Sequence, residues 1–221
     1  MRNPAVLFVL GVICLRGYAA EKPPAQIINV LVFDFASVPA DILNRAMSES
    51  KRIVESAGVR FLWIDCPVAP ERLASEESCR DAPGPLTLVL HVLPSQASRR
   101  QTEPAAFGFA VRPEDGGFGA YAGVFRDRVE QLRGPINKAA LLGNVIAHEF
   151  GHLLLGTGQH SAGGIMKADW RHEHLTLAAQ GRLQFDEADR GRIFGNVRRR
   201  TLAANSMPAE VPRATKLTGQ H

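Results

Sequence analysis

Residues 136–155 of the chain read INKAALLGNVIAHEFGHLLL. Pro135 suits the first turn of a helix and Gly156 suits the residue just past its end, so one long helix is predicted here. Apolar residues occupy nearly every side of this helix, which is typical of a helix buried in the interior. Two histidines and a glutamate also belong to it. A buried polar group without a partner costs roughly 1–3 kcal/mol, so these three side chains need strong partners.

Within this helix, residues 148–152 form the pattern His-Glu-x-x-His. His148 and His152 are separated by about 400° of helical rotation, so their rings share one face, one turn apart. Two histidines placed in this way can bind one metal ion. Glu149 is rotated by about 100° from His148, which makes it a poor third ligand but allows it to reach a water on the metal.

A catalytic zinc site usually has three protein ligands and one open position, so a third ligand is needed. His160 is the favoured candidate. Gly156 can adopt the left-handed conformation that ends a helix, and Gly158 lets the chain turn again. The residues between His152 and His160 can span about 25 Å when extended, which is enough for His160 to return to the metal.

These residues resemble the zincin metalloproteases, and within them the metzincins, whose pattern HExxHxxGxxH precedes a tight turn with a methionine beneath the metal. The matching residues are His148, Glu149, His152, Gly156, His160 and Met166. The resemblance implies Zn²⁺ as the cofactor, the three histidines as its ligands, Glu149 as the general base and Met166 as the turn methionine. The glycine comes one residue later than in the metzincin pattern and the third histidine two residues later, so a divergent branch is implied.

The segment Trp-Arg-His-Glu-His, residues 170–174, holds the other candidates for the third ligand. Glu173 follows His152 at a distance close to that of the gluzincins, which take a glutamate from a second helix. His172 and His174 flank it. The segment is typical of a solvated helix start, and the rest of the gluzincin second-helix motif is missing. Glu173, His172 and His174 therefore stay as alternatives to His160.

The order of elements predicts the fold class. Runs of β-branched and aromatic residues predict strands at 27–35, 59–64 and 86–93, and shorter apolar runs predict a hairpin or flap at 106–111 and 120–125. A crossover helix capped by Ser37 is predicted between the first two strands, and a last helix near 185–197 ends in the solvated cations Arg198–Arg200. We predict an α+β zincin fold: a mixed twisted sheet, the crossover helix, the active-site helix and a smaller C-terminal helical subdomain.

The N-terminus is typical of a secretory signal peptide. An apolar run at residues 5–15 is too short to span a bilayer, and small residues allow cleavage after Ala19. We predict a signal peptide at 1–19, a zincin-like catalytic domain at 20–200 and a disordered tail at 201–221. A secreted or periplasmic protein is expected.

The cysteines agree with export. Cys14 lies inside the apolar run and leaves with it, so Cys66 and Cys79 remain as an even pair. Because the compartment outside the cytoplasm is oxidising, we predict a disulfide between them.

Composition limits the possible partners. The chain of 221 residues is 45% hydrophobic and 22% charged, which is typical of one globular domain. The mean hydropathy of -0.07 argues against a multispan membrane protein. The formal charge of +4 includes two arginines of the predicted signal peptide, so no nucleic-acid partner is expected. We expect a monomer without membrane contact after signal removal.

The predicted function is a secreted zinc peptidase that acts on a peptide or protein substrate. By family analogy the substrate would lie extended along an exposed strand edge, for which residues 120–125 are the candidate. Two alternatives remain open: a non-catalytic secreted scaffold that binds zinc, and a zinc hydrolase of a non-peptide amide or ester.

Overall fold

The computed structural model describes residues 25–94 and 106–207. The predicted signal peptide, and the predicted tail after Met207, lie outside the described residues. In chain order the elements are β1 (Gln26–Asp34), α1 (Ala40–Glu55), β2 (Val59–Cys66), α2 (Pro70–Leu73), the 3₁₀ turn η1 (Glu77–Cys79), β3 (Thr87–Leu93), β4 (Gly108–Val111), β5 (Tyr121–Phe125), α3 (Arg126–Glu130), α4 (Lys138–Leu155), α5 (His172–Ala179) and α6 (Glu187–Ser206).

The five strands form one mixed sheet in the order β2-β1-β3-β5-β4. β1 pairs in parallel with β2 and β3, β3 pairs in parallel with β5, and β4 alone is antiparallel to its neighbour β5. This arrangement confirms the predicted mixed sheet with α1 as the crossover between two parallel strands. The expected substrate edge at residues 120–125 is wrong. β5 lies inside the sheet because the hairpin partner β4 pairs with it and takes the edge.

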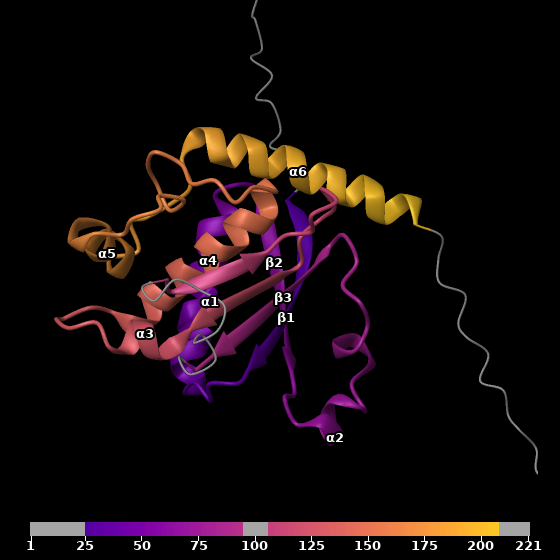
Figure 1. The fold of residues 1–221 in the computed structure, drawn as a ribbon, viewed down its shortest axis with the longest axis horizontal. Helices are drawn as coiled ribbons and strands as arrows, with labels where there is room; N and C mark the ends of the chain where they lie inside the picture. The colour runs from indigo at the N-terminus through magenta and orange to yellow at the C-terminus, as the bar shows by residue number, and fades with distance from the viewer. Residues whose placement is uncertain (1–24, 95–105, 208–221) are drawn as a thin grey trace, which may run out of the picture.

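Two layers of side chains cover the sheet. Ile28, Val30 and Val32 of β1 belong to the main core with the buried residues of α1 and α4, which cover one face (Figure 1). The alternate residues Leu31 and Phe33 belong to a smaller cluster that contains both cysteines. Period-two alternation in a strand explains why one segment supplies both clusters.

A disulfide between Cys66 and Cys79 joins the end of β2 to the turn η1, with the two Cα atoms 5.7 Å apart. The predicted bridge is thus confirmed. It closes a loop with a sequence separation of 13 residues. Because few residues of this loop are buried, the bridge limits the freedom of a segment that packing restrains weakly.

The start of α1 differs from the prediction. Ser37 has a positive φ of 51° and lies before the helix, whose N-cap position is held by Pro39. The carboxylate of Asp34 instead organises this turn, because it accepts hydrogen bonds from the N–H groups of Ala36 at 3.0 Å and Val38 at 2.7 Å. An aspartate that bonds nearby backbone N–H groups is a common alternative to a helix cap.

The last helix, α6, extends to Ser206, so residues 201–206 belong to this helix. The prediction of a solvated Arg200 is also wrong, because its side chain is only 1% exposed. Its guanidinium donates to the carbonyls of Pro85 at 3.0 Å, Gly119 at 2.8 Å and Leu153 at 2.9 Å. Arg200 lies seven residues after Ile193 and three after Val197, so the three share the buried face of the helix.

Among the described residues, no helix combines the length and the apolar character that a membrane span requires.

Candidate metal centre

The helix α4 carries the His-Glu-x-x-His residues through the core. Its first turn is capped by Asn137, whose side chain accepts a hydrogen bond from the N–H of Ala140 at 3.1 Å. Its end is set by Gly156, which adopts the left-handed conformation with φ 64°. Glycine adopts this conformation at little cost, so the chain leaves the helix one turn after His152.

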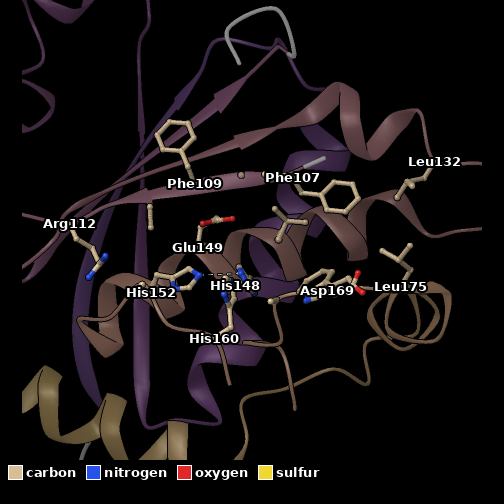
Figure 2. Close-up of a pocket in the computed structure, with 17 residues that line it drawn as sticks. Phe107, Phe109, Arg112, Leu132, His148, Glu149, His152, His160, Asp169 and Leu175 are labelled. Carbon is tan, nitrogen blue, oxygen red and sulfur yellow. Dashed lines mark hydrogen bonds between the residues drawn. The ribbon is translucent and has the colours of Figure 1, made fainter. Parts of the chain in front are cut away.

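Three histidines meet beside this helix. The candidate ligand nitrogens of His148, His152 and His160 all lie within 4.8 Å of one another. The ring of His160 lies face to face with that of His148 at 5.4 Å between centroids and edge to face with that of His152 at 4.8 Å. The three rings thus surround one point (Figure 2).

The loop after α4 brings His160 to this point through backbone hydrogen bonds. The N–H of Thr157 donates to the carbonyl of His152 at 3.2 Å, which continues the turn begun at Gly156. The N–H of Ser161 donates to the carbonyl of Met166 at 2.9 Å, and that of Ile165 donates to the carbonyl of Gln184 at 2.8 Å. These bonds close a compact turn beside the three histidines.

Backbone carbonyls orient two of the rings. Nδ1 of His148 lies 2.7 Å from the carbonyl oxygen of Ile165, and Nδ1 of His152 lies 3.0 Å from that of Thr157. A carbonyl can only accept, so each Nδ1 carries the hydrogen, and each Nε2 of a neutral ring holds a lone pair. Such partners of the second ring nitrogen are typical of metal-binding histidines.

The two Nε2 atoms of His148 and His152 are 3.3 Å apart. Two lone pairs at this distance repel each other unless a cation lies between them. Burial lowers the pKa of His148 to about 4, so this ring is neutral at neutral pH. Its Nε2 atom therefore carries no proton that could bridge the two nitrogens. Two nitrogens bound tetrahedrally at about 2.0–2.1 Å from Zn²⁺ would lie about 3.3–3.4 Å apart, and the observed spacing therefore fits zinc.

The carboxyl group of Glu149 is buried, with 6% of the residue exposed. Without a nearby cation, burial raises the pKa of this group to about 8. The edge strand β4 passes close by, because a Cβ atom built on Gly108 would lie 2.8 Å from Oε1 of Glu149. Glycine at position 108 therefore leaves the space that this carboxyl group occupies.

Met166 lies on the other side of the motif and is fully buried. A Cβ atom on Gly151 would lie 2.3 Å from its Sδ atom, so the methionine packs directly on the backbone of α4. Gly151 immediately precedes His152. Met166 therefore contacts the turn of α4 that carries His152.

A cavity of about 750 Å³ opens over the histidines. Its apolar side chains include Phe107, Leu132, Val145, Trp170 and Leu175. Arg112 lies at the opposite end from Leu132 and Leu175, with the histidines and Glu149 between them (Figure 2). The cavity therefore has the cationic Arg112 at one end, and the apolar side chains of Leu132 and Leu175 together with the carboxylate of Asp169 at the other.

The alternative ligands lie elsewhere. Among the described residues, the only group of three or more metal-ligating side chains close enough to share an ion is the histidine triad. His172, Glu173 and His174 form the first turn of α5 and do not belong to it. Of the candidates for the third ligand, the structure brings His160 alone to the first pair.

Other residues of the site escaped the sequence reasoning. The ring of Trp170 packs edge to face on that of His148 at 5.5 Å between centroids. The hydroxyl of Ser161 donates to both carboxylate oxygens of the buried Asp189, at 2.9 and 2.8 Å. These bonds tie the loop of His160 to α6, where Arg192 also pairs with Asp189. The only local signal is that Ser161 directly follows His160.

The hydroxyl of Ser161 holds the loop next to His160 in place through Asp189, so its loss should affect metal binding by displacing the ring of His160. We expect Ser161→Ala to weaken zinc affinity about 10-fold, because outer partners that orient metal ligands commonly contribute 10–100-fold. A competition titration with a fluorescent zinc chelator measures this. Ser48→Ala is the matched control, since it removes an exposed hydroxyl bonded to the carbonyl of Asn44 on α1. Equal affinities of the two variants would contradict the positioning role of Ser161.

No protein-family model matches the chain, and no curated protein sequence matches it. Solved structures, in contrast, are similar to it. Archaemetzincin from Methanopyrus kandleri is similar with a TM-score of 0.51 and 18% identity, over 81% of this chain and 99% of that chain. A zinc-dependent peptidase from Methanocorpusculum labreanum is similar with a TM-score of 0.50 and 18% identity, over 74% of this chain and 99% of that chain. At this identity the likeness concerns the fold: the chain has the mixed α/β fold of these metallopeptidase structures.

Proposed function

We propose that the chain is a zinc-dependent metallopeptidase of a divergent metzincin type, with His148, His152 and His160 as its zinc ligands. One observation carries this proposal: the Nε2 atoms of His148 and His152 lie 3.3 Å apart, and each holds a lone pair. The lone pairs are on Nε2 because the Nδ1 atom of each ring donates its hydrogen to a backbone carbonyl. The third imidazole and the cavity above complete a site with room for a substrate. The similar structures, archaemetzincin and a zinc-dependent peptidase, support the same reading.

Zinc held by these three histidines would lower the pKa of a bound water toward 7 and would polarise a substrate carbonyl. Glu149 is the general base in this proposal: its carboxylate takes the proton of the attacking water and passes it to the departing amine. The carboxylate must be ionised for the first step. A divalent cation nearby favours that ionised form and opposes the effect of burial.

The substrate would add at β4, the edge strand of the sheet among the described residues, and not at β5. Val111, at the end of β4, is exposed. An extended peptide can pair with the unpaired backbone groups of such an edge. A peptide paired with β4 at Gly108 would then lie close to Glu149, because Gly108 has no side chain between β4 and this carboxyl group.

Export is part of the proposal. It is supported by the N-terminal apolar run and by the disulfide between Cys66 and Cys79, because such bridges persist mainly in oxidising compartments. N-terminal sequencing of the protein recovered outside the cytoplasm tests it, with Ala20 expected as the first residue.

Metal analysis combined with a proteolysis assay tests the proposed activity. We expect a single zinc ion per purified chain and cleavage of unfolded protein substrates. A chelator should stop the cleavage and lower the free energy of unfolding by about 2–4 kcal/mol, since a ligand that binds only the folded state stabilises it. Re-added zinc should restore both. Bound zinc without cleavage of any protein, amide or ester would favour the scaffold alternative and contradict the enzyme.

A further inference from the structure

Arg112 stands at the cationic end of the cavity. It follows directly after β4, and its side chain lines the same space as His152, His160 and Gly158 (Figure 2). A Cβ atom on Gly158 would lie 2.5 Å from Nη2 of Arg112. The guanidinium therefore packs over the backbone of the loop that carries His160, in the space that a side chain at position 158 would fill.

This guanidinium has no carboxylate partner within the described part of the chain, where no hydrogen bond or ion pair involves it. The acidic groups of its surroundings form no ion pair with it in this part of the chain. Asp115 accepts from the N–H of Gly117 at 3.0 Å, and Glu114 lines, together with Arg112 itself, a second hollow to which Arg199 and Arg200 also belong. Asp169, which also lines the cavity, pairs with Arg171 at 2.7 Å. An exposed arginine beside a substrate cavity is thus left for a carboxylate from outside.

The edge strand sets which part of a peptide meets Arg112. β4 runs from Gly108, next to Glu149, toward Val111 and then Arg112. Antiparallel strand pairs outnumber parallel pairs two- to three-fold, so a peptide added to this edge is expected to run in the opposite direction. Its residues before the scissile bond then lie toward Arg112, and those after the bond lie toward Phe107 and Leu132.

We propose that Arg112 is a specificity-determining residue that selects peptides with a glutamate or aspartate on the N-terminal side of the scissile bond. This inference rests on the proposed peptidase function, whose substrate class it narrows. The carboxylate would bind in a bidentate manner to the planar guanidinium, a geometry that lysine does not reproduce.

Peptides that differ at one position test the selection. The zinc-loaded full chain is given peptides with Glu, Gln or Lys at the first, second or third position before a single cleavable bond, followed by leucine. At one of these positions we expect kcat/KM about 5-fold higher for Glu than for Gln, the size of an exposed ion pair, and lowest for Lys. The preference should weaken as salt rises from 0.05 to about 0.5 M.

Variants assign the preference to this side chain. Arg112→Gln should remove the difference between Glu and Gln, and Arg112→Glu should make Lys the preferred residue. Arg60→Glu is the matched control: it makes the same charge change at an exposed position of β2, the opposite edge of the sheet, and should keep the wild-type preference. A preference that survives in Arg112→Gln, or that Arg60→Glu removes equally, would overturn the inference.

A binding measurement separates this inference from the proposed function. Fluorescence anisotropy of the labelled Glu and Gln peptides is recorded with the zinc-loaded Glu149→Gln variant, with and without Arg112→Gln. If the Glu peptide binds more tightly than the Gln peptide, and Arg112→Gln removes this difference, the inference is supported. If the wild type hydrolyses neither peptide, the proposed peptidase function is refuted. Hydrolysis of both peptides at equal rates and equal affinities would leave the peptidase standing and overturn the inference.

Discussion

Glu149→Gln is expected to abolish peptide hydrolysis while the zinc ion stays bound. The amide has the size of the carboxylate, so it fits the space that Gly108 leaves next to the edge strand. It cannot accept the proton of the attacking water. Loss of a general base commonly lowers kcat about 10²–10⁴-fold, and we expect a loss at the upper end because Glu149 serves both proton transfers. Initial rates and zinc content of the same preparation measure the two properties together.

Glu55→Gln is the matched control for this variant. It removes the same charge from an exposed position at the end of α1, where the side chain is 3.9 Å from Lys51. We expect its kcat and zinc content to equal those of the wild type. Full activity of Glu149→Gln would refute this residue as the base, and loss of zinc from it would show that the carboxylate serves the metal site instead.

His160→Ala is the second variant with a large expected effect. Removing one of three imidazoles should weaken zinc binding by more than about 100-fold, the upper range for an outer partner, and hydrolysis should disappear with the metal. The exposed ring of His160 supports little packing, so the fold should persist. Zinc affinity by chelator competition and circular dichroism distinguish loss of metal from loss of fold.

His172→Ala and His174→Ala are matched controls from the turn that holds the alternative ligands. Both should keep wild-type zinc affinity, since neither ring belongs to the triad. Full zinc retention by His160→Ala, with loss of zinc in either of these variants or in Glu173→Gln, would transfer the third ligand to α5.

Much of the fold could be predicted because its signals are local. The alternating residues of β1 place Ile28, Val30 and Val32 on one face whatever the rest of the chain does. Which strand of the predicted hairpin lies at the edge could not be predicted in the same way. Both β4 and β5 are short apolar runs, and β4 takes the edge because the distant strand β3 pairs with β5.

Arg200 and Asp189 show a second limit of local patterns. Each is charged and belongs to a helix rich in charged residues, yet both are buried. Arg200 is satisfied by Pro85, Gly119 and Leu153, which come from three different parts of the chain. The helical period places Arg200 on the face of Val197, but only distant carbonyl groups make burial of its charge possible.

For the site, the sequence alone determined that His148 and His152 share one face of a buried helix, with Glu149 turned away. Helical geometry is set within one turn of chain, so this part needs no distant contact. Only the tertiary structure decided that His160 joins them, that β4 passes over Glu149 and that Arg112 faces the same cavity. These relations depend on the course of loops anchored to α6 and to the sheet, and contacts between segments far apart in the chain leave no periodic trace in the sequence.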